Sequence, residues 1–212
     1  EDPNFEWTTR LPLVTIPTTA GTGAEVTPFA TVWDHERKRK LSVASALAFP
    51  DLAYLDVSLT LTLSPRETLY PGLDAISHAL ESLWNHNITP VSRALAIQAL
   101  ALANVALPGV IRHPDSLAHR TRMQQASLLA GMAISQTRTA IAHAISYPLT
   151  AHHGVPHGLA CSFTLPVLLR ANIKRIPQSD FESRLLHDLL HVLDTLQLGR
   201  RLSDYLNRDQ IN

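Results

Sequence analysis

The sequence beyond residue 64 is dominated by long segments with helical periodicity. Apolar and small residues recur every three or four positions over 72–83, 90–107 and 116–134, and the last two segments are rich in Ala and Leu. Ser64 is followed by Pro65 and Glu67, an order typical of an N-cap residue, a proline in the first turn and an acidic residue close behind it. The pattern predicts helix after helix from about residue 64 onward.

Residues 11–56 differ from this helical region. Two short apolar runs, 11–17 and 52–56, flank a loop of small residues at 18–23, and short β-branched runs bounded by Pro or Gly are typical of strands. We therefore expect an α/β piece at residues 1–60 and an all-α domain at residues 61–212.

Composition argues against several classes of partner. Lys plus Arg and Asp plus Glu number 18 each, so there is no basic field to attract nucleic acid or an anionic membrane. Charged residues, His or Pro interrupt every apolar run before it reaches the length of a membrane span. We expect a protein that binds neither nucleic acid nor a membrane.

Cysteine usage bears on the cellular compartment. The single cysteine, Cys161, excludes an internal disulfide framework and fits a reducing environment. The opening residues, Glu-Asp-Pro-Asn-Phe-Glu-Trp, lack the basic-then-apolar order of a signal peptide. Both features favour a cytoplasmic protein.

Histidine is unusually frequent, with eleven residues, and it suits metal binding and proton transfer. Asp74 and His78 lie four positions apart in a helical segment, so their side chains share one helix face and can share an ion. Their neighbours on that face are apolar or small, and a buried carboxylate there needs a positive partner. The pair alone fits either a metal site or a helical Asp beside an ordinary, partly buried His.

Two further histidines follow. His143 lies in Ala-His-Ala-Ile-Ser-Tyr-Pro-Leu, a helical segment that Pro148 is expected to end or kink, and His157 lies between Pro156 and Gly158. One carboxylate with three imidazoles is a mixed nitrogen and oxygen set suited to Fe(II) or Zn(II), and it can leave a position for a substrate oxygen. Each of these histidines, taken singly, also fits a structural role.

The order of the motifs resembles the group III, iron-containing alcohol dehydrogenases. It runs Pro-Thr-Thr-Ala-Gly-Thr-Gly-Ala-Glu at 17–25, Phe-Pro-Asp-Leu-Ala at 49–53, Gly-Leu-Asp-Ala-Ile-Ser-His-Ala-Leu-Glu at 72–81, His-x-x-x-Tyr-Pro-Leu at 143–149 and Pro-His-Gly at 156–158. The resemblance extends from about residue 11 to 166. It implies a dehydroquinate synthase-like architecture, in which an α/β nucleotide-binding domain precedes a helical metal-binding domain. The family's metal ligands fall on Asp74, His78, His143 and His157.

The resemblance also implies a nicotinamide cofactor, either NADH or NADPH. The glycines of the loop at 18–23 let the backbone approach a ligand closely, although such a loop by itself is often only a turn. In the family, the dinucleotide is contacted at the positions of Thr18, Thr19 and Thr22, and further cofactor positions fall on Thr31 and Lys40. Lys40 also fits a solvated basic turn.

One part of the family pattern is missing. Family members begin with a Gly-rich pyrophosphate loop that precedes the Thr/Gly loop, and this sequence has neither that loop nor the strand–helix alternation that carries it. We expect a truncated chain that lacks on the order of 100 N-terminal residues, about a small domain. Residues 1–60 would then be the C-terminal part of the nucleotide-binding domain.

The implied chemistry is hydride transfer between the nicotinamide and a carbonyl that the metal polarises. Many relatives carry a further His four residues after the third metal ligand, and this sequence has Tyr147 there. A tyrosine can hydrogen-bond, donate a proton or pack against the cofactor ring, and the sequence does not choose among these roles.

Arg138 is the residue from which we predict the class of substrate. It lies five residues before His143, where relatives that act on simple alcohols usually have a small residue, and a guanidinium there could pair with a phosphonate or carboxylate. Arg138 fits a surface arginine equally well. With His153 as a second contact, and Asn85, His86 and His152 as helpers, we expect a small anionic aldehyde. The amino-acid sequence around His143 and His157 is most similar to that of the phosphonoacetaldehyde reductase branch of the family.

Three alternatives stay open. Glycerol dehydrogenases and dehydroquinate synthases share the architecture and use zinc, the latter as lyases, although the Thr/Gly loop and the Asp-x-x-x-His helix favour the alcohol dehydrogenase branch. A non-catalytic, metal-stabilised helical module is the third. The Ala/Leu-rich helix at 94–107 allows a homodimer but reads equally well as core.

Overall fold

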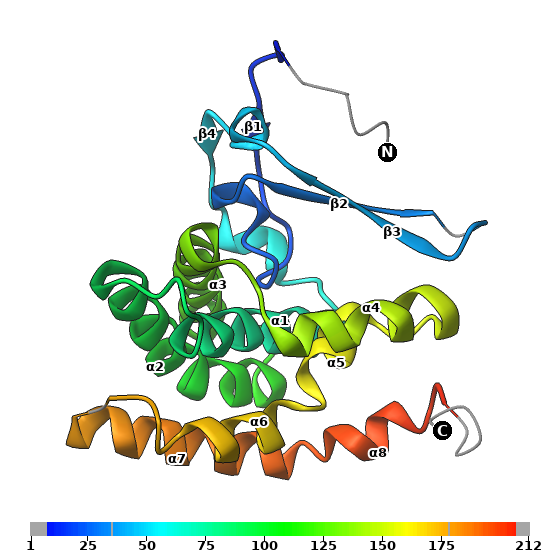
Figure 1. Cartoon of the computed structure of the whole chain (residues 1–212). Coiled ribbons are helices and arrows are strands. Elements are labelled where there is room, and N and C mark those ends of the chain that lie inside the picture. Colours follow the sequence, from blue (N-terminus) through cyan, green and yellow to red (C-terminus); the bar gives the residue numbers. More distant parts are fainter. Residues whose placement is uncertain (1–7, 35, 178, 207–212) are drawn as a thin grey trace.

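The computed structural model describes residues 8–34, 36–177 and 179–206, and in it a small strand-containing part precedes a larger helical part (Figure 1). The first part holds β1 (Val14–Thr15), η1 (Ala24–Val26), β2 (Phe29–Asp34), β3 (Arg39–Ala44), η2 (Ala46–Ala48), β4 (Leu52–Ala53) and η3 (Val57–Thr60). The second holds α1 (Pro65–Leu83), α2 (Pro90–Arg112), α3 (Leu117–Thr137), α4 (Ile141–His153), α5 (His157–Ser162), α6 (Leu165–Asn172), α7 (Asp180–Thr195) and α8 (Leu198–Leu202). The predicted order of an α/β piece and a helical region is confirmed, while the division into two domains at residue 60 remains a prediction.

The strands form two separate pairs. β1 and β4 lie in the two apolar runs that predicted strands, and they pair in parallel, with Val14 opposite Leu52. β2 and β3 form an antiparallel hairpin in which Trp33 lies opposite Lys40. The hairpin was not predicted from the sequence, because its second strand opens on the last two residues of the basic run at 37–40, which resembles a solvated turn. Lys40 therefore lies in a strand and not in a turn.

Local capping sets the start of α1. The Ser64 hydroxyl accepts a hydrogen bond from the backbone N–H of Glu67, and the Glu67 carboxylate accepts one from the N–H of Ser64, each 3.2 Å long. This reciprocal pair satisfies two of the N–H groups that a helix start leaves unbonded. The predicted N-cap at Ser64 is confirmed.

Prolines inside the helices do not end them. Of the two effects predicted for Pro148, an end or a kink, the end is wrong, because α4 continues to His153 and stops at Gly154, which has a left-handed φ of 65°. Ala144, whose carbonyl loses its usual partner at Pro148, is an exposed residue, so water can bond that carbonyl.

The core of the helical part forms around α1. Figure 1 shows α1 behind α4 and beside α2 and α3, and α1 contacts each of these helices. Leu73, Ile76 and Leu80 of α1 are completely buried, and so are the small residues Ala126 and Ala130 of α3, which let the helices approach closely. α7 lies along the far side of the helical part and buries Leu186, Leu189 and Leu193.

Glycine contacts hold the loop at 18–23 against the helices. Gly23 has a left-handed φ of 61°, and a Cβ atom on it would lie 2.5 Å from the Cα atom of Gly131 in α3. Only glycine at both positions allows so close an approach. The Thr/Gly loop is thereby fixed on the surface of the helical part.

By length and composition, α2 would suffice to cross a membrane, with a mean hydropathy of 1.9 over its most apolar window. Pro108 does not interrupt this helix, although proline was expected to break each apolar run before it reached the length of a membrane span. The core helix of a soluble protein passes the same test, and α2 packs against α1, α3 and α7.

Candidate metal centre

Four side chains from three helices lie together, with three imidazoles around one carboxylate oxygen. Asp74 and His78 come from α1, His143 from α4 and His157 from the first position of α5. The Nε2 atoms of the three histidines lie 3.4 Å (His78), 3.3 Å (His143) and 3.8 Å (His157) from Oδ1 of Asp74. The four residues that the family resemblance singled out are thus brought together.

This geometry suits a single divalent ion. Four donors around a tetrahedral metal, with bonds of about 2.1 Å, lie about 3.4 Å from one another, close to the spacing of the imidazole nitrogens from Asp74. Nε2 of His143 is buried without a hydrogen-bond partner, although it lies 3.3 Å from Oδ1 of Asp74. The rings of His78 and His143 stack with centroids 4.8 Å apart, which aims both Nε2 atoms at the same oxygen. The donor set of one oxygen and three nitrogens fits iron or zinc.

The protonation of these groups follows from their burial and their mutual attraction. Burial opposes the charge on Asp74, but attraction to His78, His157 and His143 holds its pKa well below the usual range. Burial lowers the pKa of His78 to about 4, despite the nearby Asp74. For His143, burial is outweighed by Asp74 and Glu81, which raise its pKa to about 9. Without a metal, His143 therefore carries the positive charge that the carboxylates require.

Glu81 is a partner that the sequence analysis missed. Its side chain is completely buried, and Oε2 lies 2.6 Å from Nδ1 of His143. Oε1 accepts hydrogen bonds from the backbone N–H groups of Ala142, at 2.6 Å, and of His143, at 3.4 Å. A carboxylate on Nδ1 fixes the orientation of the ring and leaves Nε2 for the ion. The signal was present, because Glu81 follows Asp74 by seven positions on the same apolar face of the helix.

Replacing Glu81 with Gln is expected to weaken metal binding by roughly 10- to 100-fold, the usual effect of losing a group that orients a ligand. The amide removes the charge that holds the imidazole of His143 in place. Metal affinity is measured by competition with a chromophoric chelator. Glu67→Gln on the same helix is the matched control, because Gln serves as well as Glu in a capping box. Equal affinity in both variants would remove Glu81 from the site.

Cys161 also contacts the centre. Its thiol donates a hydrogen bond to Oδ1 of Asp74, with a distance of 3.3 Å between sulfur and oxygen. Burial, together with the negative charge of Asp74, raises the pKa of this thiol well above its ordinary value, so it stays protonated. Sγ belongs to a group of donor atoms, with Asp74, His143 and His157, that lie within 4.8 Å of one another. From the sequence, Cys161 had been related only to the redox compartment.

Metal affinity is expected to rise with pH. The pKa of His143 is raised to about 9, so this imidazole is protonated at neutral pH and must lose its proton when a metal binds. The apparent dissociation constant should fall roughly tenfold for each pH unit between roughly pH 6 and 8, the slope for one released proton. His78, with a pKa lowered to about 4, is already neutral in this range. Competition titrations across this range measure the slope, and a dissociation constant independent of pH would contradict it.

The β2–β3 hairpin brings two further predicted residues together. The Nζ atom of Lys40 lies 3.7 Å from the centre of the Tyr147 ring on α4. Trp33, opposite Lys40 in the hairpin, has its ring 6.3 Å from that of His157. Paired residues of an antiparallel hairpin point to the same face, so one face of the hairpin covers α4 and the start of α5. Trp33 was not predicted as a site residue from the sequence.

The threonines of the cofactor prediction lie on the surface. Thr18, Thr22 and Thr31 are exposed, and Thr19 is half-buried. The hydroxyl of Thr22 accepts a hydrogen bond from the N–H of Ala24 at 3.3 Å, which shapes the loop ahead of η1. These side chains are accessible to a ligand.

The residues predicted for the substrate are not gathered around Asp74 in the same way. Arg138 is exposed and caps α3 with a φ of 69°, and its carbonyl accepts a hydrogen bond from the Asn85 side chain at 3.2 Å. His153 is half-buried near the end of α4 and has its ring 6.4 Å from that of His152. Within residues 8–206, apart from 35 and 178, no hydrogen bond, ion pair or ring contact joins either side chain to the four clustered residues.

Both parts of the chain match known families and proteins. Residues 68–195 match the model described as Fe-containing alcohol dehydrogenase family, C-terminal, and residues 2–57 match the model described as iron-containing alcohol dehydrogenase. The phosphonoacetaldehyde reductase of Streptomyces viridochromogenes is 42% identical over 168 residues, which cover 79% of this chain and 42% of that protein. The 1-propanol dehydrogenase PduQ of Salmonella typhimurium is 37% identical over 159 residues, 75% of this chain and 43% of that protein. The chain thus spans less than half the length of these relatives.

A solved structure shares the fold. The sulfoacetaldehyde reductase of Bifidobacterium kashiwanohense, crystallised in complex with NAD+, superposes with a TM-score of 0.81 and 32% sequence identity. The match covers 96% of this chain and 57% of that one. The α/β piece and the helical part therefore lie together as they do in that enzyme.

Proposed function

Because the chain belongs to the iron-containing alcohol dehydrogenase family, we propose that the protein is a metal-dependent, NAD(P)-linked alcohol dehydrogenase or aldehyde reductase. The observation that carries this proposal is the convergence of three imidazole nitrogens on Oδ1 of Asp74, within 3.8 Å or less. A buried carboxylate with three convergent imidazoles is a preformed site for Fe(II), with Zn(II) as the alternative.

Asp74, His78, His143 and His157 would hold the ion, and Glu81 keeps His143 oriented toward it. A divalent metal bound there supplies Lewis acidity to a carbonyl oxygen of the substrate. His78 and His143 are almost completely buried, with 5% and 3% of their surface exposed, whereas His157 is only half-buried. The substrate would therefore approach from the side of His157, under the hairpin.

The nicotinamide cofactor, NADH or NADPH, would lie on the same side. The hydroxyls of the loop residues Thr18, Thr19 and Thr22 can donate hydrogen bonds to its phosphate and ribose oxygens. Thr31 and Lys40, the two other residues proposed to contact the cofactor, belong to the β2–β3 hairpin. Since the ammonium group of Lys40 lies over the ring of Tyr147, we assign Tyr147 to the cofactor side of the site. The related sulfoacetaldehyde reductase, crystallised in complex with NAD+, supports a nicotinamide cofactor.

For the substrate we propose a small anionic aldehyde such as phosphonoacetaldehyde. Support comes from the phosphonoacetaldehyde reductase at 42% identity and from the exposed cation Arg138, with His153 as a second contact. The 1-propanol dehydrogenase at 37% identity represents the alternative, a neutral substrate.

Steady-state kinetics, followed at the absorbance band of the reduced nicotinamide, tests both the metal dependence of the reaction and the preference for an anionic aldehyde. We expect activity that a chelator abolishes, and a kcat/KM for phosphonoacetaldehyde at least tenfold above that for propanal, because a charged hydrogen bond contributes about 1.5–3 kcal/mol. Arg138→Ala should raise KM for the anion and leave the KM for propanal unchanged. Equal efficiency on both aldehydes would remove the anionic substrate, and chelator-insensitive activity would remove the metal mechanism.

The oligomeric state, the cellular location and the partners of the protein stay predictions. We also propose a homodimer, a cytoplasmic location and a small-molecule substrate as the partner. Neither nucleic acid nor a membrane enters the proposed reaction.

A further inference from the structure

Arg120 is a buried arginine outside the metal centre. Only 3% of its surface is exposed. Nε donates to the carbonyl of Pro114 at 2.8 Å, and Nη1 donates to the hydroxyl of Thr68 at 2.9 Å. Nη2 is buried and has no hydrogen-bond partner. A buried N–H without a partner costs free energy, and on a charged group the cost is larger.

The positive charge of Arg120 is also uncompensated. In the part of the chain that the structure describes, no Asp or Glu forms an ion pair with it. Burial lowers its pKa, but a guanidinium stays protonated in proteins. Arg120 therefore keeps a buried positive charge that the described residues leave without a partner carboxylate.

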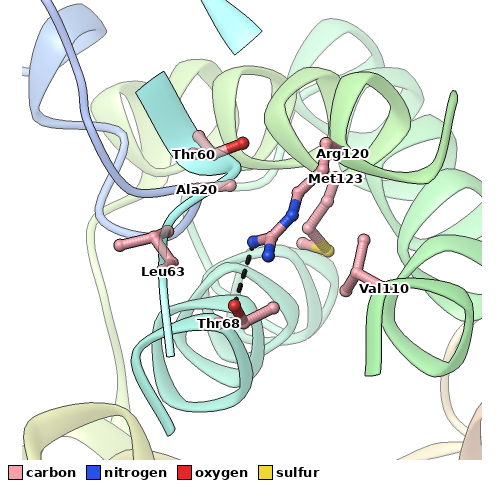
Figure 2. Close-up of a pocket in the computed structure, with 7 residues that line it drawn as sticks. All are labelled: Ala20, Thr60, Leu63, Thr68, Val110, Arg120 and Met123. Atoms are coloured by element: carbon pink, nitrogen blue, oxygen red, sulfur yellow. Dashed lines mark hydrogen bonds between the residues drawn. The ribbon is translucent and has the colours of Figure 1, made fainter. Parts of the chain in front are cut away.

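A small cavity lies beside this guanidinium. Figure 2 shows the Arg120 side chain reaching into a space that Ala20, Thr60, Leu63, Thr68, Val110 and Met123 surround. The centre of a water-sized sphere is free to move within about 10 Å³, which is close to the room that a single water-sized particle needs. A phosphate or an organic carboxylate is too large for this space.

The cavity offers donors and no carboxylate. The hydroxyl of Thr68 accepts from Arg120, and none of the hydrogen bonds in the described residues uses its proton. The hydroxyl of Thr60 is occupied, since it donates to the carbonyl of Val57 at 2.8 Å. An occupant that accepts from Nη2 and from Thr68 and carries a negative charge would satisfy every orphaned group.

We propose that this cavity binds a monatomic anion, chloride under cellular conditions, on Nη2 of Arg120. A water molecule is smaller than chloride and would also accept the hydrogen bond, but it would leave the charge of Arg120 uncompensated. Ala20 belongs to the Thr/Gly loop and Thr60 to η3, whereas Thr68 and Arg120 belong to the helical part. The anion therefore stabilises the junction between the two parts of the chain.

Two measurements on the protein in its native length test the site. In the first, thermal unfolding is followed in sodium chloride and in sodium gluconate of equal ionic strength, because gluconate is too large for the cavity. Chloride should raise the Tm by a few degrees in the wild type, as a ligand of the folded state does. Arg120→Gln should lose this difference. Arg122→Gln, which removes an exposed arginine two positions along the same helix, should keep it.

In the second, crystals of the wild-type protein are grown or soaked in sodium bromide, and the anomalous signal of bromine is mapped. A peak within hydrogen-bond distance of Nη2 of Arg120 supports the proposal, and this result stands even if Arg120→Gln fails to fold. Density in the cavity without anomalous signal would identify water and overturn the proposal. A Tm that is equal in the two salts, or a chloride effect that persists in Arg120→Gln, would overturn it as well.

Discussion

Replacing Asp74 with Asn is expected to abolish stoichiometric metal binding and, with it, the proposed dehydrogenase activity. The three Nε2 atoms within 3.8 Å would then face a neutral amide, so the ion would lose its only negatively charged ligand in the cluster. The loss of affinity should exceed the roughly 10- to 100-fold expected for a group that only orients a ligand. Elemental analysis of the purified variant and the nicotinamide absorbance assay measure the two consequences.

The matched control is Asp188→Asn, which removes the same charge from an exposed position on α7. This variant should retain one equivalent of metal and wild-type turnover. If Asp74→Asn also retained one equivalent of iron or zinc, Asp74 could not be a ligand and the centre would need another set of donors. Loss of activity with full metal content would instead place Asp74 in the reaction but not in the coordination shell.

Replacing Gly158 with Ala is expected to cause the largest loss of stability. A Cβ atom at Gly158 would lie 1.9 Å from the backbone oxygen of Tyr70, so α5 would have to move away from α1. Overpacking usually costs about 1–3 kcal/mol, and a contact with rigid backbone belongs at the upper end of that range or above it. In a domain of this size the Tm should fall on the order of 10 °C.

The same displacement should weaken the metal centre, because His157 directly precedes Gly158 and its Nε2 atom lies 3.8 Å from Asp74. Gly199→Ala is the control, since a Cβ atom there has nothing within 4 Å and needs no unusual φ. Thermal unfolding and metal content are compared between the two variants. A Gly158→Ala protein as stable as Gly199→Ala would show that the α1–α5 contact can relax and does not fix His157.

Buried charge links the candidate metal centre and the proposed anion site. At the metal centre, Asp74 and Glu81 are buried carboxylates, and His143 is protonated until a cation takes its place. At the other site, Arg120 is a buried cation that lacks a carboxylate. Both places lie on helices whose apolar faces pack tightly, where an uncompensated charge is costly. Each therefore indicates the sign of the ion that suits it.

The sequence by itself determined the features that depend on near neighbours. The capping box of Ser64 and Glu67 and the presence of helices at α1, α2 and α3 follow from hydrogen bonds and side-chain contacts within a few residues. The four-residue spacing of Asp74 and His78 determined that they share a face. Their union with His143 and His157 came from the resemblance to a family, because periodicity carries no information about contacts between distant helices.

The tertiary structure decided everything that distant segments create together. Glu81 contacts His143, and Lys40 lies over the ring of Tyr147. Arg120 borders a cavity lined by both parts of the chain. Each contact joins residues more than fifty positions apart in the sequence. Such pairings depend on how helices and loops pack, and each residue alone is compatible with a solvated or structural role. The ions that suit these sites become evident only once burial removes the water that would otherwise solvate their charges.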